Sequence, residues 1–106
     1  MEFEDYQHQA DKFSNSQVKG IDQYLMGALG LTGEAGELAD EIKKVVFHNK
    51  PLDVDVIAKE LGDVLWYLSY LCSVFKLDLR EVAKRNIKKL TNRHGDSFKP
   101  HDQQNR

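Results

Sequence analysis

The sequence lacks the features that mark several protein classes. Its single cysteine, Cys72, cannot form an internal disulfide, which fits a reducing compartment. The longest uncharged run, between Val64 and Lys76, is too short to span a bilayer. The first residues are acidic and polar, without the basic and apolar regions of a secretory signal. We therefore expect a cytoplasmic protein with no membrane partner.

A large charge of one sign is also missing. The 15 Lys and Arg residues nearly balance the 17 Asp and Glu residues, so the formal net charge is −2. A nucleic-acid partner is therefore not expected. With 106 residues the chain is long enough for one small domain, which we place at residues 1–98, followed by a mobile tail at 99–106.

Proline is scarce, with two residues, and no segment alternates apolar and polar residues over the length of a strand. The hydrophobic periodicity is helical instead, which predicts an all-α, four-helix, bundle-like subunit. Asp53 is the expected N-cap of the third helix, Asp78 with Glu81 a capping box for the fourth, and Gly95 its C-terminal stop. The predicted helices cover residues 3–14, 22–47, 54–76 and 78–93.

The second predicted helix contains glycines at 27, 30, 33 and 36, each costing about 1 kcal/mol relative to alanine. They indicate either a close approach of another helix or ligand, or a kink near Gly30 to Gly33. The third helix is apolar nearly all round between Val64 and Phe75. A small domain cannot cover every side of it, so we expect a homo-oligomer formed through the central helices, with Trp66 in the interface.

Two pairs of carboxylates at helical spacing are the strongest functional signal. They are Glu34-x-x-Glu37 and Glu60-x-x-Asp63. Residues three apart lie on one face of a helix, so two facing helices would bring four carboxylates together. Oxygen ligands suit a hard cation, which predicts Mg²⁺ or Mn²⁺.

Ordinary explanations exist for each pair. Glu34 and Glu37 fit a solvated acidic face, and Glu60 could form a buried salt bridge with Arg85 or Lys59. A di-iron centre of the helical-bundle type needs Glu-x-x-His motifs, and no glutamate here is followed three residues later by histidine. Oxygen-only ligation therefore favours magnesium over iron.

The fourth predicted helix has an asparagine, Asn86, within its apolar stripe, and Lys89 and Arg93 follow along the edge of that face. This arrangement fits either a structural asparagine beside two solvated cations or a polyanion site. Tyr67 lies one turn after Asp63 and could orient a ligand or a carboxylate.

Taken in order, these motifs resemble the MazG-type nucleotide pyrophosphohydrolases of the all-α NTP pyrophosphohydrolase superfamily. The resemblance runs from about Tyr6 to Arg93 and includes Tyr6-Gln7-x-x-Ala10 and Gly30-Leu-x-Gly-Glu-Ala-Gly-Glu-Leu38. It also includes Glu60-Leu-Gly-Asp-Val-Leu-Trp-Tyr67 and Asn-x-x-Lys-x-x-x-Arg. The usual proline after the final arginine is replaced here by His94-Gly95.

The resemblance implies Mg²⁺-dependent hydrolysis of an NTP or dNTP to monophosphate and pyrophosphate by a homodimer or homotetramer. Either Glu34 or Glu37 would be the catalytic base, and water could attack the α or the β phosphorus. A sibling enzyme acting on another substrate, such as phosphoribosyl-ATP, and a non-catalytic metal-binding assembly are the alternatives. The implied metal ligands are Glu34, Glu37, Glu60 and Asp63, and the implied triphosphate-binding residues are Asn86, Lys89 and Arg93, with Tyr67 nearby.

Overall fold

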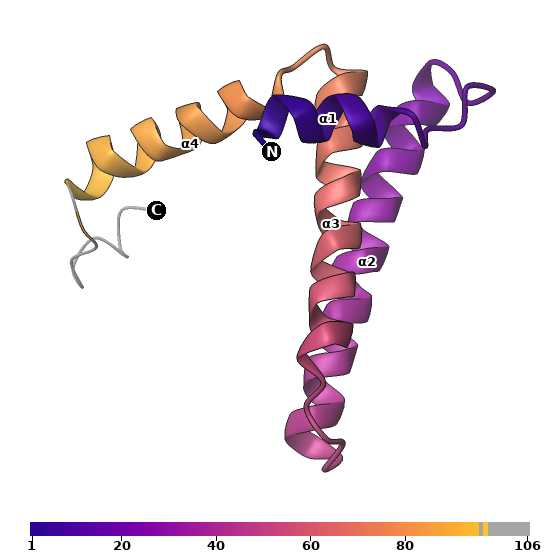
Figure 1. Cartoon of the computed structure of the whole chain (residues 1–106), viewed down its shortest axis with the longest axis vertical. Coiled ribbons are helices and arrows are strands. Elements are labelled where there is room, and N and C mark those ends of the chain that lie inside the picture. The colour runs from indigo at the N-terminus through magenta and orange to yellow at the C-terminus, as the bar shows by residue number, and fades with distance from the viewer. Residues whose placement is uncertain (96, 98–106) are drawn as a thin grey trace.

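The structure, a computed structural model, describes residues 1–95 and 97 and contains four helices in this range (Figure 1). No strand occurs among these residues, which confirms the all-α prediction. The predicted tail at 99–106 lies outside the described residues. The helices are α1 (Phe3–Asp11), α2 (Ile21–Phe47), α3 (Val54–Val74) and α4 (Leu79–His94).

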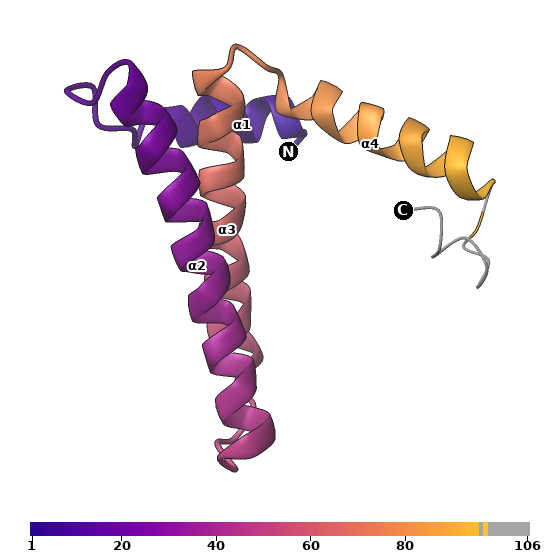
Figure 2. The same ribbon diagram turned by 180° about the vertical axis from the view of Figure 1, so that it is seen from behind.

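An antiparallel hairpin of α2 and α3 forms the long axis of the molecule. Helix α1 crosses α3 near the open end of this hairpin, and α4 leaves the same end and points away from it (Figures 1 and 2). In the connection at the closed end, the Asp53 side chain accepts a hydrogen bond of 3.0 Å from the Asp55 N–H. The predicted N-cap of α3 is therefore confirmed.

The ends of α4 agree in part with the expected caps. The Asp78 carboxylate accepts from the Arg80 N–H at 2.9 Å, and Gly95 ends the helix with a φ of 72°. The reciprocal bond of the predicted capping box does not form among the described residues. The Glu81 carboxylate lies instead 3.5 Å from the Lys84 ammonium, one turn further along the helix.

The glycines of α2 divide into two kinds, and α2 itself continues unbroken through all of them. A Cβ atom at Gly30 would overlap the ring of Tyr67 on α3, and one at Gly27 would overlap Leu71. Gly33 and Gly36 have nothing within 4 Å of an added Cβ. Close approach of α3 therefore accounts for the first two glycines, and the helix is not broken near Gly30 to Gly33.

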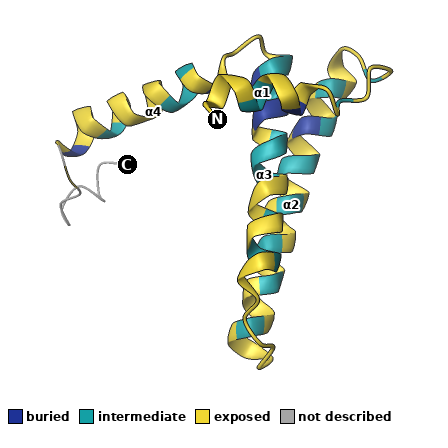
Figure 3. Cartoon of the chain, in the orientation of Figure 1, coloured by how far each residue is buried: buried dark blue, intermediate teal, exposed yellow. Residues whose placement is uncertain are grey.

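The hydrophobic core is small and lies where α1, α3 and α4 meet (Figure 3). The radius of gyration is 16.7 Å, against about 13 Å for a compact domain of this length. The accessible surface is 8132 Å², against about 6,100 Å² for a compact monomer of this mass. The single chain is therefore an open subunit. Its buried apolar residues among those described are Ala10, Tyr70, Cys72 and Leu79.

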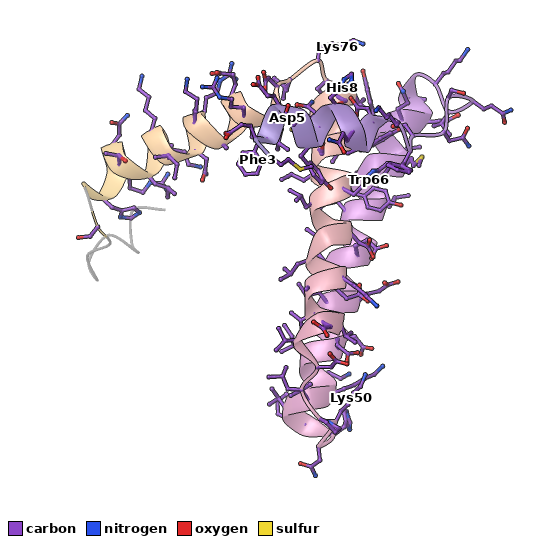
Figure 4. The ribbon with its side chains drawn as sticks, viewed as in Figure 1. Phe3, Asp5, His8, Lys50, Trp66 and Lys76 are labelled. Carbon is purple, nitrogen blue, oxygen red and sulfur yellow. The ribbon has the colours of Figure 1, made fainter. Side chains whose placement is uncertain are left out.

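Trp66 belongs to this internal packing. Its indole N–H donates to the Ala10 carbonyl oxygen at 3.1 Å, and its ring stacks on Tyr70 with centroids 5.4 Å apart. Figure 4 shows Trp66 just below α1. Trp66 therefore joins α1 to α3 within the chain and is half-buried there, and its place in a subunit interface stays a prediction.

The described helices include none that is both long and apolar enough to cross a membrane.

Candidate metal site

Three of the four predicted acidic ligands converge on the α2–α3 hairpin. Glu34 and Glu37 stand three residues apart on α2, and Glu60 faces them from α3. One carboxylate oxygen from each lies within 4.8 Å of the other two. We call these three residues the acidic cluster. Their donors are oxygen atoms only, which is the ligand type that Mg²⁺ and Mn²⁺ prefer.

Two oxygens of the acidic cluster lack the partners that buried carboxylates normally have. Glu34 Oε2 and Glu60 Oε2 are buried, and no described residue donates a hydrogen bond to either. A carboxylate removed from water is costly unless a hydrogen bond, an opposite charge or a metal ion compensates it. These two atoms therefore fit a cation bound between the helices.

The electrostatics of the acidic cluster are those of crowded like charges. Burial is the main cause that raises the pKa of Glu34, and the charges of Glu37, Asp63 and Glu60 raise it further. Burial also raises the pKa of Glu60, with added repulsion from Glu37, Asp63 and Glu41. Bringing a cation to this place would relieve the repulsion and favour the ionised carboxylates.

The ordinary explanations for the acids find little support among the described residues. No ion pair there includes Glu60, so the salt bridge to Arg85 or Lys59 is not observed. Further along α2 the acids are paired with lysines: Asp40 lies 3.1 Å from Lys44. The acidic cluster thus differs from the solvated, charge-balanced part of the same helix.

Asp63 and Tyr67 lie at the edge of the acidic cluster. Asp63 is exposed and its oxygens are not part of the 4.8 Å group, although its charge raises the pKa of both Glu34 and Glu60. Tyr67 is half-buried, because its ring packs on Gly30 and meets Trp66 edge-on at 5.0 Å.

The predicted phosphate-binding residues lie on a different part of the molecule. Asn86, Lys89 and Arg93 are exposed on α4, which packs against α1 and the end of α3. Because α4 points away from the hairpin, one chain does not bring these residues to its own acidic cluster (Figure 1).

Tyr6 is a neighbour of the site that was not among the predicted site residues. Burial and then the charge of Asp63 raise the pKa of the Tyr6 hydroxyl. Helix α1 packs against α3, the helix that carries Asp63. The place of Tyr6 in the Tyr6-Gln7-x-x-Ala10 motif was the available signal, since helical spacing alone does not say which helix α1 contacts.

Four helices with carboxylates converging from two of them define an all-α protein with a candidate divalent-cation site. The chain belongs to the MazG nucleotide pyrophosphohydrolase domain family, whose model matches residues 24–98. This range contains every predicted metal-binding and phosphate-binding residue but excludes α1.

A protein of Mycobacterium phage L5 named "Gene 37 protein" is 38% identical over 69 residues. The match covers 61% of this chain and 60% of the phage protein, whose name states no activity. No solved structure matches the chain.

Proposed function

We propose that this protein hydrolyses nucleoside triphosphates, either NTP or dNTP, to nucleoside monophosphate and pyrophosphate with the help of Mg²⁺ or Mn²⁺. Membership of the MazG family supports the general class of reaction. The observation that carries the proposal is the pair of buried, unpartnered oxygens of Glu34 and Glu60 beside Glu37. On a merely structural acidic face such oxygens would be hydrated, whereas in a metal site they would be the atoms that bind the ion.

In this proposal Glu34, Glu37 and Glu60 hold the ion, and Asp63 completes the site from its edge. A divalent ion held there would neutralise phosphate oxygens and lower the pKa of a bound water molecule. The proton of the attacking water goes to a carboxylate that is not fully used as a ligand. Glu37 is more exposed than Glu34, so solvent water reaches it more easily, which favours Glu37 as the base.

A homo-oligomer is part of the proposal, because α2 has an uncovered apolar stripe. Eight exposed, uncharged residues repeat along it at alternating steps of four and three, the spacing of a helix–helix seam. The middle of the stripe has small side chains, which let another helix approach closely. The residues of this α2 stripe are Ile21, Leu25, Ala28, Thr32, Ala35, Ala39, Ile42 and Val46.

Helix α3 adds exposed apolar residues at the same kind of spacing, Val54, Leu61 and Leu68. By helical geometry of about 3.6 residues per turn, the α2 stripe and these α3 residues lie on the hairpin side opposite Glu37 and Asp63. A second copy seated on this side would cover both without blocking the acids. We propose a dimer or a tetramer assembled in this way, with Asn86, Lys89 and Arg93 of another copy reaching the acidic cluster.

The function is tested by measuring pyrophosphate release from a panel of NTPs, dNTPs and phosphoribosyl-ATP, with and without millimolar Mg²⁺. We expect release from one or more nucleoside triphosphates, and none after EDTA treatment. Release from phosphoribosyl-ATP alone would assign the chain to a sibling activity. Magnesium binding without release from any substrate would mean a non-catalytic assembly.

The assembly is tested by light scattering at micromolar concentration. We expect at least a dimer for the wild type, and dissociation for Leu25→Glu, which puts a charge into the α2 stripe. Phe13→Glu is the matched control, because Phe13 is also apolar and exposed but lies outside the hairpin. A folded wild-type monomer, or equal dissociation by both variants, would contradict the proposed interface.

A further inference from the structure

One side chain of α1 contacts three parts of the segment that joins α3 to α4. The Gln7 amide nitrogen donates to Ser73 Oγ and to the Leu77 carbonyl oxygen, both at 3.0 Å. The Gln7 amide oxygen accepts from the Leu79 N–H at 2.8 Å. A single amide therefore connects α1, the last turn of α3, the α3–α4 connection and the first residue of α4.

The orientation of the Gln7 amide is fixed by its neighbours. The Ser73 hydroxyl donates to the Asp11 carboxylate at 2.8 Å, and an ionised carboxylate can only accept. Ser73 Oγ must then accept from Gln7, so the amide nitrogen faces Ser73 and the amide oxygen faces Leu79. Reversing the amide would place two acceptors against each other at the Leu77 carbonyl.

The bond to Leu79 satisfies a group that the helix itself leaves without a partner. The first N–H groups of a helix have no intrahelical acceptor. Asp78 takes the N–H of Arg80 at 2.9 Å, and Gln7 takes that of Leu79. Leu79 is 3% exposed, so water is not an adequate substitute for Gln7.

A change of direction at this junction grows along α4, which points away from the α2–α3 hairpin (Figure 1). With a rise of 1.5 Å per residue, Lys89 lies about 15 Å and Arg93 about 21 Å beyond Leu79. A tilt of about 10° would therefore move Lys89 by about 2.6 Å and Arg93 by about 3.7 Å. A misplacement of about 1 Å is enough to harm binding geometry.

We propose that Gln7 is a positioning residue that fixes the direction of α4 and, through it, the placement of Lys89 and Arg93 against the phosphates of the substrate. The second half of this inference rests on the proposed function. It assigns a task to the Tyr6-Gln7-x-x-Ala10 motif: Gln7 holds α4, while the Ala10 carbonyl holds α3 through Trp66.

The first test is amide hydrogen exchange by NMR, which needs no turnover. Gln7→Met keeps the size of the side chain and removes its three hydrogen bonds, so we expect exchange at Leu79 to become at least about tenfold faster. Gln9→Met is the matched control on the exposed side of α1. Ser73→Ala, which leaves the Leu79 bond in place, should have a smaller effect. Unchanged exchange at Leu79 in a folded Gln7→Met protein would overturn the inference.

The second test is a mutant cycle on KM and kcat. We expect Gln7→Met to raise KM about tenfold or more with kcat nearly kept, as Lys89→Ala should. If Gln7 acts through Lys89 and Arg93, adding Gln7→Met to a variant that already carries Lys89→Ala and Arg93→Ala should raise KM little further. Additive effects, or a loss of kcat alone, would overturn the positioning role.

The two tests fail separately. If the wild type hydrolyses no nucleotide but Gln7→Met speeds exchange at Leu79, the proposed function falls and the role of Gln7 in holding the start of α4 stands. If the wild type turns over nucleotides but exchange at Leu79 is unchanged in Gln7→Met, the proposed function stands and the role of Gln7 falls.

Discussion

Two groups of polar residues lie along α3, and they differ in whether their polar atoms have hydrogen-bond partners. At the C-terminal end of α3, the amide, hydroxyl and carboxylate groups of Gln7, Ser73 and Asp11 satisfy one another. In its first half, Glu60 joins Glu34 and Glu37 in a cluster with two buried oxygens that no described residue pairs. The first group is satisfied within one chain, whereas two oxygens of the second have no partner among the described residues.

This difference separates structure from function. A satisfied polar junction stabilises one arrangement of helices and needs no ligand. An unsatisfied acidic cluster costs stability until a cation compensates it, and proteins keep such costs where they bind or react.

The substitution with the largest expected effect is Glu60→Gln, which tests whether the acidic cluster is the functional site. Removing this charge with little change of shape should lower turnover by more than about 100-fold, because it takes a ligand from the proposed metal. The fold should persist, as judged by far-UV circular dichroism. Asp22→Asn is the control, since Asp22 is exposed in the first turn of α2. Full activity of Glu60→Gln with added Mg²⁺ would exclude the acidic cluster as the site.

Between the two polar groups, Gly30 fixes how close the hairpin helices come. Gly30→Ala should destabilise the protein by about 1–3 kcal/mol, because the new methyl group meets the Tyr67 ring. Gly33→Ala in the same helix meets nothing within 4 Å and should stabilise it by up to about 1 kcal/mol. Urea unfolding measures both. Equal effects of the two substitutions would contradict the close approach at Gly30.

The dependence of stability on pH provides a further test of the acidic cluster. The raised pKa values of Glu34 and Glu60 mean that the folded state holds protons more tightly than the unfolded state. Their contribution to the free energy of unfolding therefore falls as pH rises above the ordinary glutamate pKa, and the penalty is complete above the folded pKa.

Without metal, Glu60→Gln should accordingly melt at a higher temperature than the wild type at pH 7, and the difference should shrink toward pH 4. Mg²⁺ at millimolar concentration should raise the wild-type melting temperature at pH 7 and raise that of Glu60→Gln much less. This account would be contradicted if Glu60→Gln melted below the wild type at pH 7 without metal, or if Mg²⁺ left the melting temperature of the wild type unchanged.

Sequence reasoning predicted the helices well, because Asp53, Asp78 and Gly95 are strong local stop and start signals. It also predicted the convergence of Glu34, Glu37 and Glu60, since two long antiparallel helices leave few other places for acids three residues apart. It did not predict where Trp66 packs or that α4 leaves the hairpin. Periodicity identifies the face of a helix but not the helix that covers it. The hydrogen bonds of Gln7 reach residues 66 to 72 positions away in the chain, which no local pattern predicts.

The smallest expected effect concerns the contact between Trp66 and Ala10, which joins α1 to α3 beside the hydrogen-bonded junction of Gln7, Ser73 and Asp11. Trp66→Phe removes the indole N–H that donates to the Ala10 carbonyl but keeps a ring against Tyr70. The Ala10 carbonyl still accepts from the Phe13 N–H at 3.0 Å, so it is not left without a partner. We therefore expect a loss of only about 0.5–1.5 kcal/mol in urea unfolding. The Mg²⁺-induced rise of the melting temperature should be unchanged, because the junction and the acidic cluster are separate. A smaller Mg²⁺ response in Trp66→Phe would show that the two groups of residues are coupled through α3, and the comparison between them would then fail.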